Sequence, residues 1–230
     1  MSDEYLYQRL QNARISVKEL AFRIDLPGLQ TVRAILSKTN TKTANSQLIH
    51  HKFLQNCTKP GTDVVLAPEY SLQGKGILTE KDVDRLGRSY AQATRDVALA
   101  IPGTVVWTDG KHLYNTALLF QYGKQAWHDK TPDDTDERVA TSHGLVAAAR
   151  DSMRRFTIGE TTVGLEICSE NGIVSETGKE EVDLGILIAS GGKYFTLRHV
   201  REGGYFLHCN GGDSTAKALR VTPKLRRQHW

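Results

Sequence analysis

Three residues with reactive or ionisable side chains each follow a segment that is predicted to be a strand. Glu69 comes after a short apolar run and a proline, Lys130 lies beyond the segment 124–127, and Cys168 directly follows the segment 163–167. Strand ends are where active sites collect in layered α/β folds. A thiol is weakly ionised at neutral pH, so it needs a base or a positive neighbour to act as a nucleophile. A carboxylate, an ammonium group and a thiol could supply that chemistry together.

Each of these residues also has an ordinary structural interpretation. Glu69 could be a loop carboxylate, Lys130 a surface lysine and Cys168 a small buried apolar side chain. The order and context of all three, taken jointly, decide between the interpretations. The stretches that carry this context are DVVLAPE (63–69), HLYNTALLFQYG (112–123) leading to HDK (128–130), GLEICSE (164–170) and, more weakly, REGGYFLHCNG (201–211).

These stretches resemble the nitrilase superfamily of carbon–nitrogen hydrolases, over about four-fifths of the chain. The resemblance implies an α/β fold, a four-layer α-β-β-α sandwich, and a Glu-Lys-Cys triad of Glu69, Lys130 and Cys168. It implies hydrolysis of a non-peptide amide of a small molecule through a thioester, with amide cleavage favoured over nitrile cleavage. It calls for no metal and no organic cofactor.

In this reading Glu69 takes the thiol proton, and Lys130 stabilises the oxyanion together with a backbone N–H near Ser169. Glu137 is the candidate, by position, for the second glutamate of the family, and Glu170 for a structural or substrate-orienting acid. Aromatic residues are more often core packing than substrate contacts. The candidates for substrate contact are Tyr70, Tyr114, Asn115, His128 and Tyr194.

Several features depart from the family pattern. Ser169 stands where an aromatic residue is usual, and the segment 131–133 lacks the usual histidine and apolar residue. Residues 1–30 form an N-terminal extension that the resemblance does not cover, and residues 213–230 form a short basic C-terminal tail. Members of the family use a longer C-terminal part for dimerisation, so the resemblance leaves open whether this chain forms a homodimer. An alternative function is therefore an effector or interaction protein on a nitrilase-like scaffold, which either acts on a protein side-chain amide or is catalytically inactive.

Composition sets wider bounds. The chain has 230 residues and a formal charge of +4, typical of one folded domain with a sizeable core. The mild basic excess and the absence of an aromatic-interleaved basic motif argue against nucleic-acid binding. No stretch is apolar enough to span a membrane, and the acidic N-terminus is unlike a secretory signal, so we expect a cytoplasmic protein. Three widely spaced cysteines predict free thiols, and the eight histidines show no metal-binding spacing.

The elements that must position the triad can be read from hydrophobic patterning. The first predicted strand begins near Thr31, and Thr79 is a plausible helix N-cap. An Asp-Gly pair between two apolar runs predicts a hairpin. The predicted helices are 43–57 and 79–98, and the predicted strands are 31–36, 63–67, 103–107, 112–120, 124–127, 155–158, 162–168, 184–188 and 205–209.

Overall fold

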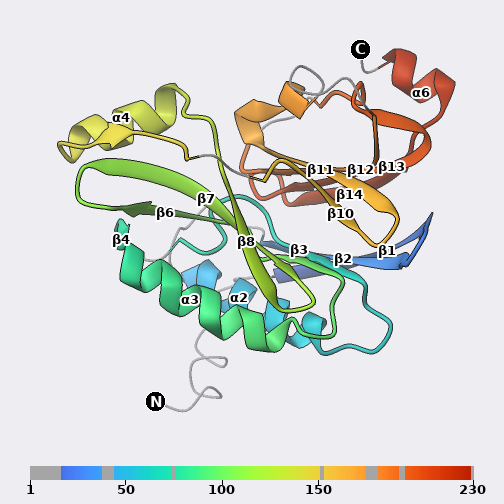
Figure 1. Ribbon diagram of the computed structural model, residues 1–230, viewed down its shortest axis with the longest axis horizontal. Coiled ribbons are helices and arrows are strands. Elements are labelled where there is room, and N and C mark those ends of the chain that lie inside the picture. The colour runs from blue at the N-terminus through green and yellow to red at the C-terminus, as the bar shows by residue number, and fades with distance from the viewer. Residues whose placement is uncertain are drawn as a thin grey trace.

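Two β-sheets lie face to face in the computed structural model, which describes residues 17–37, 44–73, 76–150, 153–174, 181–191 and 195–228 (Figure 1). In sheet A the order is β1-β2-β3-β5-β7-β6-β4, with β8 and β9 also pairing with β7, and in sheet B it is β10-β11-β12-β13-β14. The strands of sheet A are β1 (Val17–Leu26), β2 (Leu29–Ser37), β3 (Val64–Leu66), β4 (Leu78–Thr79), β5 (Leu99–Ile101), β6 (Thr104–Thr108), β7 (His112–Gln121), β8 (Lys124–Asp129) and β9 (Val146–Ala147). Those of sheet B are β10 (Arg155–Ile158), β11 (Thr161–Ile167), β12 (Val182–Ala189), β13 (Val200–Asn210) and β14 (Thr215–Arg220).

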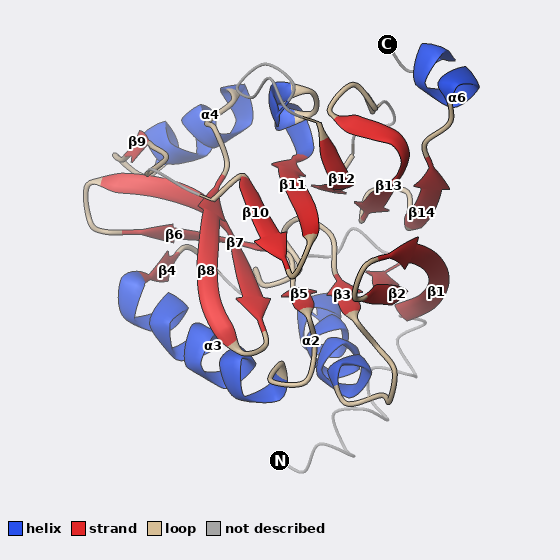
Figure 2. Cartoon of the chain, turned by 45° about the vertical axis from the view of Figure 1, so that its right-hand side comes forward, coloured by secondary structure: helices blue, strands red, loops and turns tan. Residues whose placement is uncertain are grey.

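Helices lie on the outer sides of both sheets. Helices α2 (Ala44–Cys57) and α3 (Glu80–Ala93) lie against sheet A, and α6 (Pro223–Gln228) packs Leu225 against the outer apolar cluster of sheet B (Figure 2). Helix α4 (Asp134–Ser142) lies beside β7 and β9, and a short 3-10 helix, η1 (Cys168–Glu170), follows β11. The expected α-β-β-α sandwich is confirmed. None of the helices in the described ranges is long and apolar enough to cross a membrane.

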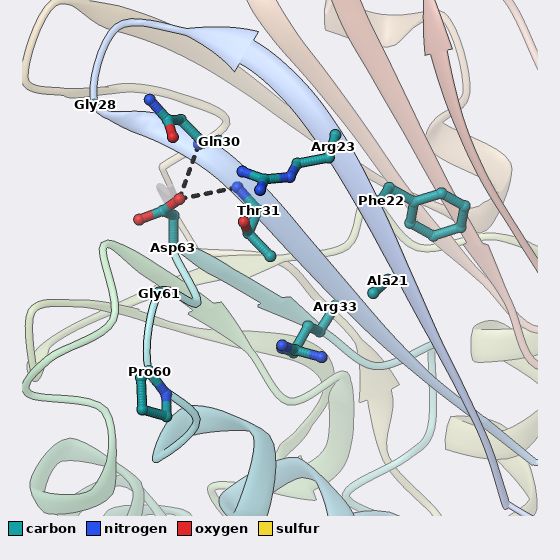
Figure 3. Close-up of a pocket in the computed structure, with 10 residues that line it drawn as sticks. All are labelled: Ala21, Phe22, Arg23, Gly28, Gln30, Thr31, Arg33, Pro60, Gly61 and Asp63. Carbon is teal, nitrogen blue, oxygen red and sulfur yellow. Dashed lines mark hydrogen bonds between the residues drawn. The ribbon is translucent and has the colours of Figure 1, made fainter.

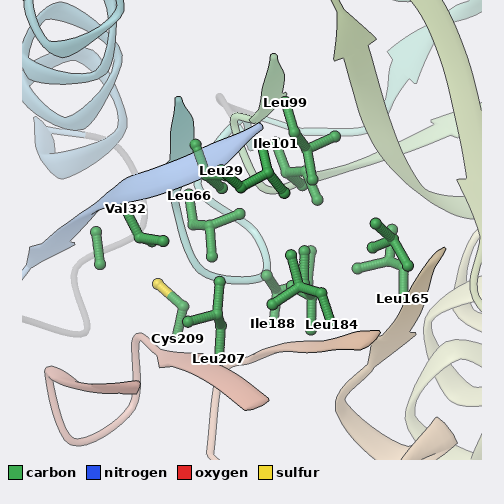
Figure 4. Packing of buried hydrophobic residues seen from close by; sticks show 14 of the residues in the cluster. Leu29, Val32, Leu66, Leu99, Ile101, Leu165, Leu184, Ile188, Leu207 and Cys209 are labelled. Atoms are coloured by element: carbon green, nitrogen blue, oxygen red, sulfur yellow. The ribbon is translucent and has the colours of Figure 1, made fainter. Parts of the chain in front are cut away.

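The main core fills the space between the two sheets (Figure 4). Successive side chains of a strand point to opposite faces, so alternate residues of the central strands meet across this space. The residues from sheet A include Val32, Leu66, Leu99 and Ile101, and those from sheet B include Leu165, Leu184, Ile186, Ile188, Leu207 and Cys209. A second cluster of buried apolar residues packs α2 and α3 against sheet A, and in it the ring of Tyr90 stacks on that of Phe120.

The N-terminal strand corrects the predicted extension. The first strand in the described part of the chain begins at Val17, not near Thr31, and β1 pairs antiparallel with β2 as part of sheet A. The sequence did contain the alternating pattern of a strand, because Leu20, Phe22, Ile24 and Leu26 alternate with more polar residues. In the structure these four side chains pack against the core. Residues 1–16 lie outside the described part of the chain.

Two further boundaries differ from prediction. The segment expected to be a basic tail contains β14, which completes sheet B, and α6. The helix predicted to reach residue 98 ends at Ala93, because the following run enters β5, a strand buried on both faces. The predicted capping by Thr79 is confirmed, since its side chain accepts a hydrogen bond from the N–H of Asp82.

Parallel pairing sets where the reactive residues emerge. Strands β2, β3 and β5 run parallel in sheet A, and β11, β12 and β13 run parallel in sheet B. Glu69 follows the C-terminal end of β3, and Cys168 follows that of β11. Ligand sites in such sheets lie outside the carboxyl ends of the strands.

If β1 belongs to the core, Ile24→Ala should lower the free energy of unfolding by about 2–5 kcal/mol, because Ile24 is 4% exposed and a cavity would remain. The neighbouring change Asp25→Ala, on the exposed face, should stay within about 0.5 kcal/mol. Urea unfolding followed by circular dichroism measures both. Equal midpoints for the two variants would show that β1 contributes nothing to the core.

Candidate active site

Glu69 is held by a tightly anchored turn after β3. The N–H of Ala67 donates to the carbonyl of Ile101, and the N–H of Tyr70 donates to Thr104 Oγ1 at 2.9 Å. Gly103 has a φ of +95°, and a Cβ there would lie 2.2 Å from the carbonyl oxygen of Pro68. Only glycine permits this approach, so the backbone next to Glu69 is fixed by the loop between β5 and β6.

Cys168 occupies a sharp turn at the end of β11. Its φ of 49° lies in the left-handed region, which is uncommon for a non-glycine residue and clusters at functional sites. Its thiol hydrogen-bonds with the Glu69 carboxylate, and the backbone N–H of Ser190, at the end of β12, donates to its sulfur. Burial raises the pKa of the Cys168 thiol to about 11, and the Glu69 charge acts in the same direction.

Lys130 follows β8, and its ammonium group is buried among three carboxylates. Its Nζ lies 2.7 Å from Asp133 Oδ2, 3.0 Å from Asp136 Oδ2 and 3.6 Å from Glu69 Oε1. Its side chain is 2% exposed, so this charge depends on its partners. Burial acts to lower the pKa of Lys130, but the surrounding carboxylates outweigh it and raise the pKa above its ordinary value.

The three carboxylates around Lys130 differ in the direction in which their surroundings shift their pKa values. Burial raises the pKa values of Glu69 and Asp136, although Lys130 opposes both shifts. Asp133 is also partly desolvated, but hydrogen bonds from Lys130 and the backbone of Asp136 hold its pKa well below its usual range. A carboxylate with a raised pKa is better suited to accept and return a proton than one held firmly ionised. Glu69, which also contacts the thiol, is the acid–base candidate.

The structure corrects the position of the second acid. Glu137 is exposed, whereas Asp136 is buried and contacts Lys130. Adjacent residues on a helix point about 100° apart, so a shift of one position exchanges buried for exposed. The signal in the sequence was the capping pattern, because Asp133 caps α4 and its N3 partner is Asp136.

Glu170 joins the strand that carries Lys130 to the turn that carries Cys168. Its carboxylate accepts from the N–H of Thr131 at 2.8 Å and the N–H of Ile167 at 3.0 Å. His128 Nε2 lies 2.7 Å from Glu170 Oε2, and Arg154 Nη2 lies 3.1 Å from Oε1. Burial acts to raise the pKa of Glu170, but these partners outweigh it and lower the pKa. Glu170 and His128 thus hold Lys130 and Cys168 in position through these contacts. Arg154, which also contacts Glu170, was not predicted from the sequence.

The remaining predicted residues lie in different places. Asn115 Nδ2 donates to Glu69 Oε1 at 3.0 Å, and the Tyr70 hydroxyl lies 3.4 Å from the same nitrogen. Ser169 is exposed, and its side chain hydrogen-bonds with Asp133.

Tyr114 was wrongly predicted to lie near the site. It is the residue before Asn115 on β7, so it points to the opposite face, where it stacks on Trp107. Tyr194 lies outside the described residues.

Other features of the described residues do not compete with this site. A concave pocket of about 660 Å³ lies between β1, β2 and the loop before β3 (Figure 3). Its carboxylate, Asp63, already accepts from the N–H groups of Gln30 and Thr31, and it precedes β3, whereas Glu69 follows it. In the described ranges no three His, Cys, Asp or Glu side chains are grouped so that they could hold a metal ion.

The Cys168 thiol should respond to the charge of Glu69. In Glu69→Gln the negative neighbour is gone, so the thiolate is less disfavoured and the pKa of Cys168 should fall below the parent value of about 11. Thiolate absorbance at 240 nm against pH, subtracted from that of Cys168→Ala, measures the midpoint. The exposed Glu137→Gln should leave it unchanged. An unchanged or higher midpoint in Glu69→Gln would contradict the contact.

Comparison with known proteins agrees with this architecture at the level of structure. No family model matches the sequence, and no curated protein matches it either. A CN-hydrolase superfamily protein from Xanthomonas campestris, with an arsenic adduct in its active site, superposes with a TM-score of 0.52 at 12% identity, covering 84% of this chain and 92% of that one. A mutant amidase from Nesterenkonia sp. AN1 in complex with acrylamide gives 0.55 at 15% identity, covering 84% and 83%.

A glutamine-dependent NAD(+) synthetase from Cytophaga hutchinsonii gives a TM-score of 0.52 at 11% identity over 85% of this chain and 35% of its own. The shared part is thus most of this chain but about a third of that enzyme. Together with the two facing sheets and the reactive residues at their strand ends, these likenesses show that the chain has the fold of the CN-hydrolase superfamily.

Proposed function

We propose that this protein hydrolyses a carbon–nitrogen bond in a small amide, with Cys168 as nucleophile. The observation that carries the proposal is the convergence of Glu69, Lys130 and Cys168 from three strand ends, with Glu69 in contact with both other side chains. A general base beside a nucleophile, and a cation beside the base, form the arrangement that nucleophilic catalysis needs.

The first half of the reaction forms a thioester. The Glu69 carboxylate takes the proton of the Cys168 thiol as the sulfur attacks the amide carbon, which avoids a free thiolate in a site that disfavours it. The tetrahedral oxyanion is stabilised by Lys130 and by backbone N–H groups near the nucleophile. Glu69 then gives its proton to the nitrogen as the C–N bond breaks, so ammonia or an amine leaves.

The second half restores the enzyme. Glu69, again ionised, takes a proton from water as its oxygen attacks the thioester carbon. The C–S bond breaks, the carboxylic acid is released, and the sulfur takes back the proton held by Glu69. Atoms and charges balance over the cycle, and the only co-substrate is water.

Proton transfer also changes what Lys130 can do. In the resting site its three N–H groups face three carboxylates, of which Glu69 is the most distant at 3.6 Å. When Glu69 takes the thiol proton it loses its charge, so its hold on Lys130 weakens. One N–H of Lys130 is then free to turn to the oxyanion that forms at the same moment.

An amide is preferred to a nitrile as substrate. The fold is shared with an amidase whose mutants are seen with butyramide and acrylamide bound. The intact contacts among the three side chains favour a catalytic role over a scaffold that only binds a partner.

The decisive experiment is ammonia release from a panel of amides and nitriles. Cys168→Ala should lower the rate by about 10³-fold or more, because no other nucleophile can form the thioester. Cys57→Ala, which changes a thiol buried in the helix-side core, is the matched control and should retain activity. Activity that survives Cys168→Ala would refute the mechanism. If the parent protein released no ammonia from any small amide, a protein side-chain amide would instead be favoured as the target.

Asp136 should matter where Glu137 does not. Asp136→Asn keeps the shape of the side chain but removes a negative partner of Lys130, so the ammonium should be held less firmly. We expect kcat to fall about tenfold. The adjacent Glu137→Gln, at an exposed position, should leave kcat unchanged. Equal effects of the two changes would mean that Asp136 does not position Lys130.

A further inference from the structure

The charge of the site is set by an excess of carboxylates around one ammonium group. Glu69, Asp133 and Asp136 all lie within 3.6 Å of Lys130 Nζ. An ammonium group has three donors, and each has a carboxylate beside it. Lys130 is therefore already paired with carboxylates in the resting site, and it cannot also serve as the counter-ion of an anionic substrate.

Asp133 brings this negative charge to the surface beside the nucleophile. Its side chain is 28% exposed, whereas those of Glu69 and Asp136 are 1% and 6% exposed. It also hydrogen-bonds with the side chain of Ser169, the residue after Cys168. Asp133 is therefore the most exposed of the three carboxylates and lies next to Ser169.

The other cations described on the neighbouring strands are paired with acids. Arg154 Nη2 lies 3.1 Å from Glu170 Oε1, and Arg150 Nε lies 2.7 Å from Asp129 Oδ2 on the opposite face of β8. Asn115 adds an acceptor to the same surroundings. Its Nδ2 is engaged by Glu69, and its buried Oδ1 has no hydrogen-bond partner within the described ranges. Among the described side chains, those around Lys130 therefore leave acceptors, and not donors, without a full set of partners.

We propose that this site selects a substrate that carries a positive charge, such as an amide whose acyl chain ends in an ammonium group. The inference rests on the proposed function for its chemistry, but the charge preference is a property of the surroundings of Cys168. Charges separated by several ångströms near a protein surface still interact by more than the thermal energy, so the preference should be measurable. Added salt should weaken this charge preference to the extent that it arises while the substrate approaches through solvent.

Charged thiol reagents test the preference without hydrolysis. Methanethiosulfonates that carry an ethylammonium, a methyl or an ethylsulfonate group are compared by their rates of modifying Cys168, each divided by its rate with a small neutral thiol. Cys168→Ala identifies the signal of this residue. The cationic reagent should react about tenfold faster than the anionic one after this correction. Equal rates, or a faster anionic reagent, would overturn the proposal.

Three amides of similar size then test the substrate class. These are 4-aminobutanamide, pentanamide and succinamate, which are cationic, neutral and anionic at pH 7. We expect kcat/KM to fall in that order, with about tenfold between the first and the last. Asp133→Asn, which retains a side chain able to cap α4, should reduce the ratio of cationic to neutral kcat/KM. Asp134→Asn, an equal change of net charge at the adjacent exposed residue, should leave that ratio unchanged.

The two proposals fail in different ways. Turnover of pentanamide or succinamate in preference to 4-aminobutanamide would overturn the charge selectivity and leave the hydrolase standing. No ammonia from any of these amides, with the cationic reagent still favoured at Cys168, would overturn the hydrolysis of small amides and support the charge selectivity of the site. An equal loss of selectivity in Asp133→Asn and Asp134→Asn would remove Asp133 from the explanation.

Discussion

The buried ammonium of Lys130 is the constraint on which the rest of the site depends. A charge that is 2% exposed is strongly unfavourable unless it is paired and hydrogen-bonded, and the removal of one partner leaves the others uncompensated. Its partners come from the loop after β3 and from the start of α4, while Lys130 itself follows β8. The pairing therefore joins the ends of two strands of sheet A, β3 and β8, to the start of helix α4. Asp133 serves twice, since it both pairs with Lys130 and caps α4.

The second sheet is joined to this centre by a different buried acid. Glu170 receives N–H groups from both sides of the gap between the sheets, Thr131 beyond β8 and Ile167 at the end of β11. Because it also contacts His128 and Arg154, its negative charge is well compensated. The thiol of Cys168 is thereby placed against Glu69 by contacts that need not take part in the reaction. A folded core of apolar residues alone would not fix that distance, because hydrophobic burial has no direction.

Sequence patterns located most of the strands, and the resemblance of four stretches to one superfamily implied the sandwich and the three central residues. Apolar runs gave the strands, and the reactive residues follow those runs directly. The errors arose where the prediction had to decide which of two adjacent residues has its side chain directed toward the site. Glu137 and Asp136 differ by one helical position, and Tyr114 and Asn115 by one strand position, yet in each pair one residue reaches the site. Arg154 could not be predicted at all, because it precedes β10 and its contact with Glu170 of η1 joins residues that are 16 positions apart in the sequence.

Strand alternation explains how one short segment serves both structure and chemistry. Along β8 and its continuation, His128 and Lys130 face the neighbouring sheet and the thiol, whereas Asp129 between them points away. There Asp129 accepts a hydrogen bond from Thr116 Oγ1 and pairs with Arg150, whose guanidinium lies over the rings of Trp107, Tyr114 and Trp127. A slip of one residue in the pairing of β7 with β8 would exchange these faces and bring a carboxylate where the ammonium now lies. The register of this hairpin is therefore as much a condition of the proposed chemistry as the identity of Lys130.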